Sequence, residues 1–526
     1  MKRRKFLRQA ALASGAIVTA GKVSATAGPA KAAGTTGAGA ATGAIRMGGN
    51  GSPARAVMTD SSGSVLRDGD GFPVVRIPGA KRKFKSQVVE KTIRELRETV
   101  GNKELGWLFE NCFPNTLDTT VDFSMDGYRP DTYVITGDID AMWLRDSSAQ
   151  VWPYLSLCNQ DKGLQQLIRG VIHRQTHCIL KDPYANAFYK DDRRVSEWQA
   201  TDITDMKPGI HERKWEIDSL CYPIRLAHGY WQTTGDVSAF DADWHDAMKR
   251  VLQTFREQQR KEGEGPYSFQ RRTSWATDGV PMGGYGYPTK KVGLIHSMFR
   301  PSDDATIYPF LIPSNLFAMN SLRDLRTILA ALPTGKGLGD EAYRLEQDLA
   351  SALAEHAIVT HPVYGEVFAY EADGFGNHTF MDDANVPSLL ALPYLQSPHY
   401  SGDLSVIHPD KRGYAVYQNT RRMVLSESNP FFFKGRAGEG IGGPHAGLDM
   451  IWPISIVIRG LTSHDSLELA KCLRLLQNSH AGKGFMHESF HKDDAAKFTR
   501  PWFAWANTLF GEFILKTYRE KPALLS

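Results

Sequence analysis

Amphipathic stripes at helical spacing recur along most of the chain and restrict it to a mostly helical fold. The first stripe follows Ser86, where Val89, Ile93 and Leu96 repeat at intervals of three and four residues between charged side chains. The chain has no strong run of alternating strands, no GxGxxG after a strand and no short-period repeat. The pattern therefore predicts an all-α protein. Further stripes lie near residues 142–157, 163–180, 217–234, 240–261, 304–331, 340–357, 414–426, 448–462, 465–479 and 502–519.

Long loops rich in glycine, proline and aspartate separate these stripes, for example at residues 278–290, 371–388 and 434–447. About ten to twelve helices joined in this way favour paired helices closed into a toroid, with short apolar helices inside and more amphipathic ones outside. Such a ring directs the loops of one rim into a common funnel, where binding residues can converge. We expect this helical domain to span residues 81–526.

The first residues have the features of an export signal. The run RRKFLR at residues 3–8 is typical of a twin-arginine signal, and an apolar stretch from Ala10 to Ala20 follows it. This stretch is too short for a membrane span, which needs about 20 apolar residues. We predict a twin-arginine signal over residues 1–33, a flexible linker over 34–80, and a periplasmic or extracellular location; a disordered basic tail is the alternative.

The formal charge of +4 originates in this leader. Residues 1–33 contain seven basic side chains and no acid, and the remaining chain has 55 basic and 58 acidic ones. Without its leader the protein is slightly acidic, so a nucleic-acid partner is not supported. We expect no membrane span, and the sequence leaves the oligomeric state open.

The cysteines and histidines show no metal or disulfide pattern. No CxxC pair is present, so packing in the core as free thiols is the expected state of the five cysteines. His173 and His177 have the spacing of a zinc pair, but the residues between them lack the glutamate of HExxH. We interpret both as core or surface histidines, and we predict chemistry without a metal or cofactor. The cysteines are Cys112, Cys158, Cys178, Cys221 and Cys472.

Four segments concentrate Trp, Arg, Asp, Glu and His beyond what a solvated helix face requires. A sugar site needs aromatic faces, charged groups that bind hydroxyls, and two separated carboxyls for acid and base chemistry. In any one segment, a buried aromatic beside a structural ion pair would be the better explanation, but four segments in one chain favour a site. They are residues 136–148 (TGDIDAMWLRDSS), 299–305 (FRPSDDA), 438–445 (GEGIGGPH) and 486–505, which contains MHESF and FTRPWFAW.

Two adjacent carboxylates, Asp303 and Asp304, are candidates for acid chemistry. Pro301 and Ser302 before them predict a helix start with Ser302 as N-cap. Carboxylates this close repel each other, which raises one pKa and can keep an acid protonated. Stabilisation of the first helical turn is the structural alternative for this pair. Glu488 is expected in a loop, where a solvated glutamate is the alternative to a catalytic one.

The longest of these motifs together resemble glycoside hydrolase family 125. The resemblance covers about residue 85 to the C-terminus, and the motifs stand in the family's order. It implies an (α/α)6 toroid that hydrolyses α-1,6-linked mannosides from the chain end, with inversion and without a metal or cofactor. A mannose-containing oligosaccharide or glycan is the implied partner. The motifs are TGDIDAMWLRDSSAQVWPYL, KWEIDSLCYP, FRPSDDATIYPFLIPSN, FMDDANVPSLLALPYL, GEGIGGPH and MHESFHKDD followed by KFTRPWFAWAN.

The resemblance also implies residue roles. The first aspartate of RPSDD is Asp303, the implied general acid, and the glutamate of MHE is Glu488, the implied general base. Two positions differ from the family, where a proline can stand at Asp140 and a serine at Gly443, so we assign neither a direct role. The residues predicted to bind substrate are Asp138, Trp143, Arg145, Asp146, Asp304 and His445.

Three other functions remain open at this stage. The toroid could act on another α-glycoside, such as an α-glucoside. It could also be a non-catalytic glycan-binding protein, although both implied carboxylates are present. A calcium-dependent mannosidase of related helical architecture is the third alternative.

Overall fold

Buried and half-exposed helices alternate along the chain in the computed structural model, which describes residues 57–59, 64–396 and 412–526. Besides α3 (Lys103–Cys112), five described helices are buried on nearly all sides, and we call these five the inner helices. The helices between them bury one face and form an outer layer. The inner helices are α5 (Leu144–Val151), α7 (Ile217–Thr234), α10 (Ile312–Ala330), α13 (Pro453–Leu461) and α15 (Ala504–Glu520). The outer ones are α2 (Gln87–Thr99), α6 (Lys162–Lys181), α8 (Ala242–Gln258), α11 (Lys336–His356), α12 (Arg412–Val424) and α14 (Ser466–Ser479).

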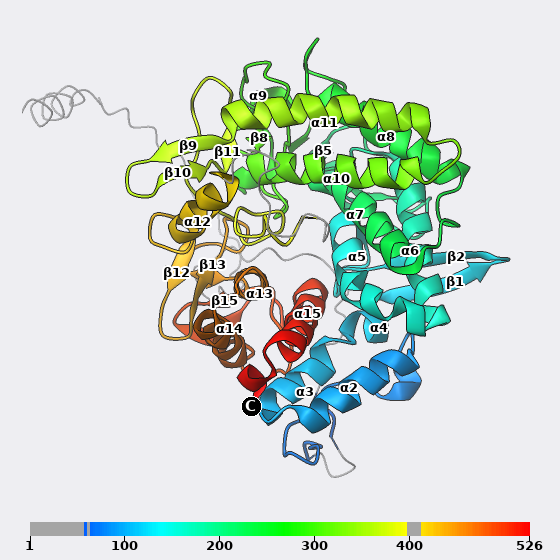
Figure 1. Ribbon diagram of the computed structural model, residues 1–526, viewed down its shortest axis with the longest axis vertical. Helices are drawn as coiled ribbons and strands as arrows, with labels where there is room; N and C mark the ends of the chain where they lie inside the picture. The colour runs from blue at the N-terminus through cyan, green and yellow to red at the C-terminus, as the bar shows by residue number, and fades with distance from the viewer. Residues whose placement is uncertain (1–56, 60–63, 397–411) are drawn as a thin grey trace, which may run out of the picture. The chain divides into compact units, whose positions relative to one another are not determined.

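These helices close into a ring. Helix α5 packs on α7, α7 on α10, and α13 on α15. The last helix, α15, packs on both α5 and α3 (Lys103–Cys112), so the two ends of the domain meet (Figure 1). The predicted all-α toroid, with apolar helices inside and amphipathic ones outside, is confirmed.

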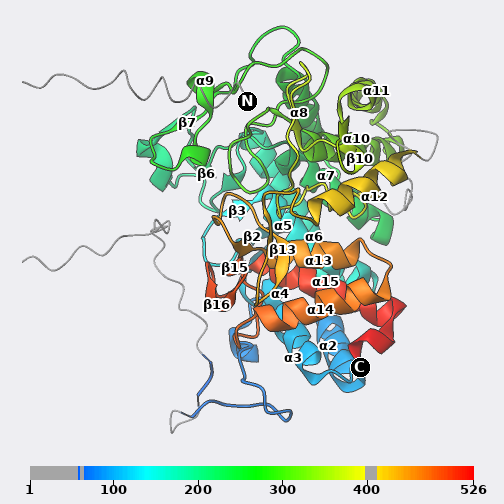
Figure 2. The same cartoon turned by 90° about the vertical axis from the view of Figure 1, so that its left-hand side faces the viewer.

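Short helices and strands occupy the loops. The strands form antiparallel pairs or triplets, and most are too short to show alternation in the sequence. Residues 121–126 (VDFSMD) do alternate, although we did not predict a strand there. In Figure 2, β3 (Met142–Trp143), β15 (Phe490–His491) and β16 (Asp494–Phe498), which belong to the predicted site segments, lie on one side of the helices. The strands are β1 (Val121–Asp126), β2 (Arg129–Val134), β3 (Met142–Trp143), β4 (Ala187–Phe188), β5 (Asp202–Ile203), β6 (Ile210–Glu212), β7 (Gln270–Arg271), β8 (Phe310–Leu311), β9 (Ile358–His361), β10 (Gly365–Phe368), β11 (Glu371–Ala372), β12 (Phe432–Lys434), β13 (Glu439–Ile441), β14 (Met450–Ile451), β15 (Phe490–His491) and β16 (Asp494–Phe498). The short helices are η1 (Gly79–Lys81), α4 (Asn115–Thr119), η2 (Trp152–Gln160), η3 (Glu197–Ala200), η4 (Ala276–Asp278), α9 (Pro281–Gly284) and η7 (Pro522–Leu525).

Helix boundaries follow local capping signals in some places and tertiary packing in others. The Ser86 hydroxyl accepts a hydrogen bond from the Val89 backbone at 3.2 Å and caps α2, where the first stripe begins. The stripe expected from residue 304 instead becomes helical only at Ile312, because Phe310 and Leu311 pair with β11 as a strand. The stripes did not predict α3.

The segment before α2 packs on the domain, although we expected a flexible linker up to residue 80. The Phe72 ring stacks on Trp107 at 5.1 Å, and the Trp107 indole donates to the Pro73 carbonyl at 3.0 Å. The Arg76 guanidinium lies 2.8 Å from the Asp118 carboxylate and 2.6 Å from Glu90. Asp68 and Asp70 also lie 3.0 Å and 2.8 Å from Arg97 of α2. The predicted linker is therefore wrong from about residue 68 onward, because composition does not show these distant partners. Residues 1–33, the predicted leader, lie outside the described residues.

The cysteines and the histidine pair are placed as expected. All five cysteines are free and buried. The buried His173 ring bonds the Pro130 carbonyl at 2.8 Å, and the more exposed His177 lies 2.9 Å from Asp192. Among the described helices, none is long and apolar enough to cross a membrane.

Candidate active site

Asp303 lies in a strained turn. The Asp303 amide donates to the Arg300 carbonyl at 2.9 Å, and the Arg300 amide donates to the Asp304 carbonyl at 2.8 Å. Asp303 has a φ of 66°, a left-handed conformation that costs most residues with a Cβ about 1–2 kcal/mol and aspartate less. The predicted helix start is wrong here. Ser302 caps no helix, because its hydroxyl donates to the Asp383 carboxylate at 2.8 Å.

Buried ion pairs and hydrogen bonds hold this turn against its strain. Arg300 is 2.7 Å from Glu371, and both side chains are almost fully buried. The Lys214 ammonium donates to the Asp303 carbonyl at 2.8 Å. Backbone strain that the surroundings impose in this way is typical of functional sites.

Asp304 serves the turn as well. Its carboxylate accepts the Thr277 hydroxyl at 2.6 Å and the Ser302 hydroxyl at 3.3 Å, and only 2% of the residue is exposed. Direct contact between Asp304 and a sugar stays a prediction. The carboxyl that pairs with Asp303 is that of Glu216, not that of its chain neighbour.

Arg145, in the first turn of α5, binds four carboxyls. One guanidinium nitrogen lies 2.5 Å from Glu216 and 3.1 Å from Asp218, and a second lies 3.1 Å from Asp303. The third nitrogen is 3.5 Å from Asp146. Only 4% of the Arg145 side chain is exposed. A cluster with one cation and four carboxyls has an excess of acid, so burial disfavours ionisation of all four.

The pKa values of this cluster are correspondingly divided. Burial raises the pKa of Glu216 well above its usual range, although the Arg145 charge opposes this. Burial alone would also raise the pKa of Asp303, but Arg145 and the hydrogen bond with Glu216 bring it below its usual range. Burial raises the pKa of Asp146 to about 6, again against the charge of Arg145.

Arg500 links this cluster to Glu488. Its guanidinium lies 3.4 Å from the Glu488 carboxylate and 3.5 Å from Asp138, and its charge also acts on Asp146 and Asp303. Glu488 is in a loop, as predicted, and only 7% of it is exposed. The Thr499 hydroxyl donates to Glu488 at 2.7 Å, which fixes the orientation of the carboxylate.

Trp143 and His445, the two aromatic residues predicted to bind substrate, lie in different surroundings. Trp143 directly precedes α5, is 5% exposed and meets the His211 ring edge-on at 5.1 Å. Its indole nitrogen is buried and has no hydrogen-bond partner among the described residues. The His445 ring lies 6.0 Å from that of Trp452, and a proton on His445 would lower the pKa of Asp303.

Comparison with known proteins identifies the family. A family model described as "Metal-independent alpha-mannosidase (GH125)" matches residues 102–515. The chain belongs to glycoside hydrolase family 125. As a family member it is a glycoside hydrolase of the α-mannosidase class.

Two relatives show how far the similarity extends. The Meiotically up-regulated gene 157 protein of Schizosaccharomyces pombe (strain 972) is 40% identical over 471 residues, covering 86% of this chain and 90% of that protein. A Streptococcus pneumoniae metal-independent α-mannosidase, solved in a non-productive complex with α-1,6-mannobiose, is also 40% identical. It covers 84% of this chain and 100% of its own, with a TM-score of 0.77.

The sequence did not single out several charged residues of this family 125 site. Glu216 and Asp218 lie between apolar residues at the start of a buried helix, and that unusual alternation (KWEID) was the available signal. Arg500 lay within a segment that we selected, but without a role. The local sequence does not show which residues Glu216, Asp218 and Arg500 contact.

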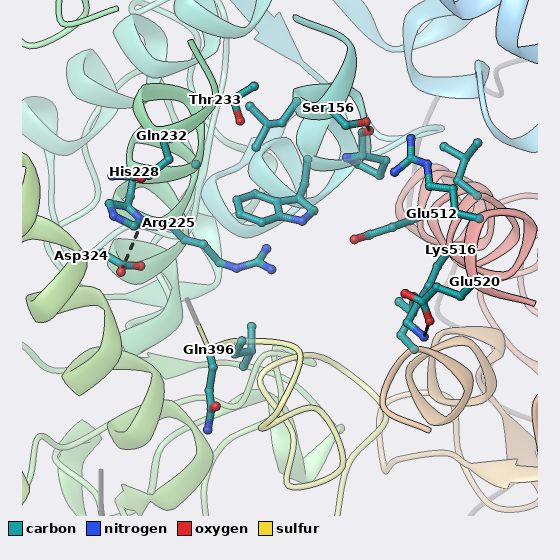
Figure 3. A pocket seen from close by; sticks show the side chains of 18 residues that line it. Ser156, Arg225, His228, Gln232, Thr233, Asp324, Gln396, Glu512, Lys516 and Glu520 are labelled. Atoms are coloured by element: carbon teal, nitrogen blue, oxygen red, sulfur yellow. Dashed lines mark hydrogen bonds and ion pairs between the residues drawn. The ribbon is translucent and has the colours of Figure 1, made fainter. Parts of the chain in front are cut away.

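A cavity of about 550 Å³ lies elsewhere in the ring. Its lining includes Trp152, Arg225, Asp324 and Glu512, from the later turns of inner helices or the residues after them (Figure 3). None of the predicted site residues, which precede or begin the inner helices, lines this cavity. Within the described ranges, no cluster of three or more His, Cys, Asp or Glu side chains has the arrangement of a metal site.

Proposed function

We propose that this family 125 enzyme removes terminal mannose from α-1,6-linked mannosides with inversion, using Asp303 as acid and Glu488 as base. One observation carries the proposal. Carboxyls from two distant loops meet at Arg500, because the Arg500 guanidinium lies 3.4 Å from Glu488 and its charge also acts on Asp303, which contacts Arg145 at 3.1 Å. The α-1,6-mannobiose bound by the similar S. pneumoniae enzyme supports the linkage.

The reaction follows from these roles. Asp303 gives its proton to the glycosidic oxygen as the bond from that oxygen to C1 breaks. Glu488 takes a proton from a water molecule whose oxygen bonds to C1 from the opposite face. An inverting pair needs its carboxyls about 6.5–9.5 Å apart to admit that water. Asp138, Trp143, Asp146 and His445 would contact the terminal sugar.

Stereochemistry and substrate choice test this function together. When hydrolysis of α-1,6-mannobiose is monitored by NMR, β-mannose should be the first anomer released. The enzyme should also retain its activity in EDTA. Release of α-mannose would exclude inversion, and loss of activity in EDTA would favour the calcium-dependent alternative. Preference for α-glucosides would support another specificity, and binding without hydrolysis would support a glycan-binding protein.

Substitution of each proposed catalytic carboxylate gives the first specific prediction. Asp303→Asn and Glu488→Gln should each lower kcat by about 10²–10⁴-fold, because each removes one proton-transfer group. The exposed Asp140, in the predicted site segment 136–148, forms an ion pair with Arg194. Asp140→Asn is the matched control and should have activity near that of the wild type. If either catalytic variant keeps wild-type turnover, its assigned role is wrong.

We also propose export by the twin-arginine route to the periplasm or the medium. Five buried free thiols suit a protein that folds in a reducing compartment before export. Replacing Arg3 and Arg4 by lysine should retain the protein in the cytoplasm, measured by fractionation of the producing cell. Unchanged export would contradict the proposed route.

A further inference from the structure

Glu216 is a carboxyl that none of the roles above uses. It is the N-cap residue of α7, its side chain is fully buried, and it forms a hydrogen bond with the carboxyl of Asp303. Both carboxyls share the same two partners. Arg145 contacts each of them, and the Asn186 amide lies 3.5 Å from Glu216 and 3.4 Å from Asp303.

This contact requires a proton. An ionised carboxylate only accepts hydrogen bonds, so two carboxyls can bond to each other only when one of them is protonated. Two buried anions in contact would also repel strongly. The proton therefore belongs to the pair, which has one negative charge opposite Arg145.

The surrounding charges are consistent with this single proton. Arg145 and Asp146 face the pair from α5, Asp218 from α7, and Lys214, His445 and Arg500 from neighbouring loops. The Lys214 ammonium binds the Asp303 backbone carbonyl, and not its carboxyl. Arg145 is thus the one side-chain cation of the described residues in contact with both carboxyls.

We propose that Glu216 is a positioning residue that stores the proton delivered by Asp303 and passes it along their hydrogen bond. The inference rests on the proposed function of Asp303. The single proton of the pair moves from Glu216 to Asp303 along this hydrogen bond, and it goes from Asp303 to the glycosidic oxygen as the bond from that oxygen to C1 breaks. The pair then has two negative charges opposite Arg145. Glu488 holds the proton taken from water, and exchange with solvent restores both groups.

A proton held by Glu216 would compensate for the effect of Arg145 on Asp303. Arg145 favours the ionised form of that carboxyl, which makes a lone Asp303 a poor proton donor at neutral pH. A buried neighbour that keeps its proton can supply Asp303 with the proton that Asp303 alone would lose. A purely structural Glu216 would instead only hold Arg145 in place.

The pH profile of Glu216→Gln distinguishes these two roles. The amide keeps the shape and a hydrogen-bond donor but exchanges no proton. Asp303 then faces Arg145 without a second carboxyl, so it loses its proton at lower pH. The alkaline limb of kcat/KM should move down by about one pH unit or more, because interacting carboxyls are coupled to at least that extent. Activity at neutral pH should fall about tenfold or more.

Leaving groups provide the second readout. A dinitrophenyl α-mannoside needs no proton to depart, so Glu216→Gln should retain most activity on it and lose activity on α-1,6-mannobiose. Asp218→Asn is the matched control, because it removes a buried carboxyl that contacts Arg145 but makes no hydrogen bond to Asp303. This variant should lose activity on both substrates alike.

The outcomes distinguish failure of this inference from failure of the proposed function. An alkaline limb within about 0.3 pH unit of the wild type in Glu216→Gln, or equal losses on both substrates, would overturn the inference. A wild-type enzyme that hydrolyses no α-mannoside would instead refute the proposed function, whatever the variant does.

Discussion

At the scale of single residues, burial makes the charge of each acid depend on its neighbours. Asp303 and Glu488 are the proposed acid and base, and their contacts differ. Asp303 faces Arg145 and Glu216, and Glu488 faces Arg500 and Thr499. A proton donor and a proton acceptor can therefore differ through their surroundings.

Asp324 provides a residue-scale prediction on stability. Burial raises its pKa to about 7, opposed by Arg225 and Arg323, whereas the unfolded chain has a value near 3.8. The folded state thus binds this proton more tightly, and stability falls as the pH rises from about 4 to about 7. The Asp324→Asn variant has no carboxyl at this position, so its stability does not fall in this way. Relative to the wild type it should gain up to about 4 kcal/mol between pH 4 and pH 7, measured by urea unfolding.

The exposed Asp205 is the control for that experiment, since its side chain is 75% exposed. Asp205→Asn should follow the pH dependence of the wild type. An Asp324→Asn variant with the wild-type pH dependence would show that the Asp324 carboxyl is ionised in the folded protein.

At the scale of elements, close helix contacts depend on single glycines. A Cβ at Gly511 of α15 would lie 2.6 Å from the Phe113 ring and 3.0 Å from the Phe113 backbone, next to α3. Gly511→Ala should therefore destabilise the fold by about 1–3 kcal/mol, as overpacking does, in urea unfolding.

Gly337 of α11 is the matched control. It is an exposed helical glycine, and a Cβ there would meet no heavy atom within 4 Å. Gly337→Ala should stabilise the protein by about 0.4–1 kcal/mol, because alanine loses less backbone entropy in a helix. Equal effects of the two substitutions would contradict the close α3–α15 packing.

At the scale of the whole domain, segments from its two ends complete the ring. Helix α15 packs on α3 and α5, and the segment before α2 is fixed by Arg76. Both Arg76 and Asp118 are buried, with 7% and 3% of their side chains exposed. The ion pair thus joins residues before α2 to α4.

Removing one partner of this pair should destabilise the domain strongly. Arg76→Ala leaves Asp118 buried without its nearest cation, which costs about 3–5 kcal/mol. The exposed Arg193, 91% accessible beside Asp191, is the control, and Arg193→Ala should change stability by less than about 1 kcal/mol. Urea unfolding midpoints compare the two variants, and similar midpoints would refute the role of the segment.

Local pattern was sufficient for much of this protein. Periodicity predicted most of the helices and the toroid, Ser86 marked the start of α2, and the motifs identified the family. These signals need only neighbours within a few turns of the chain. They failed at residues 301–311, where Pro301 and Ser302 resembled a helix start but long-range contacts impose a turn and a strand.

Tertiary structure alone decided which charges meet. The sequence contained Glu216 and Arg500, but nothing near them showed that Glu216 pairs with Asp303 or that Arg500 contacts Glu488. The positive φ of Asp303 likewise depends on distant partners such as Glu371, through Arg300. Ionisation of a buried acid depends on charges within a few ångströms, and ring closure brings those charges from segments far apart in the chain.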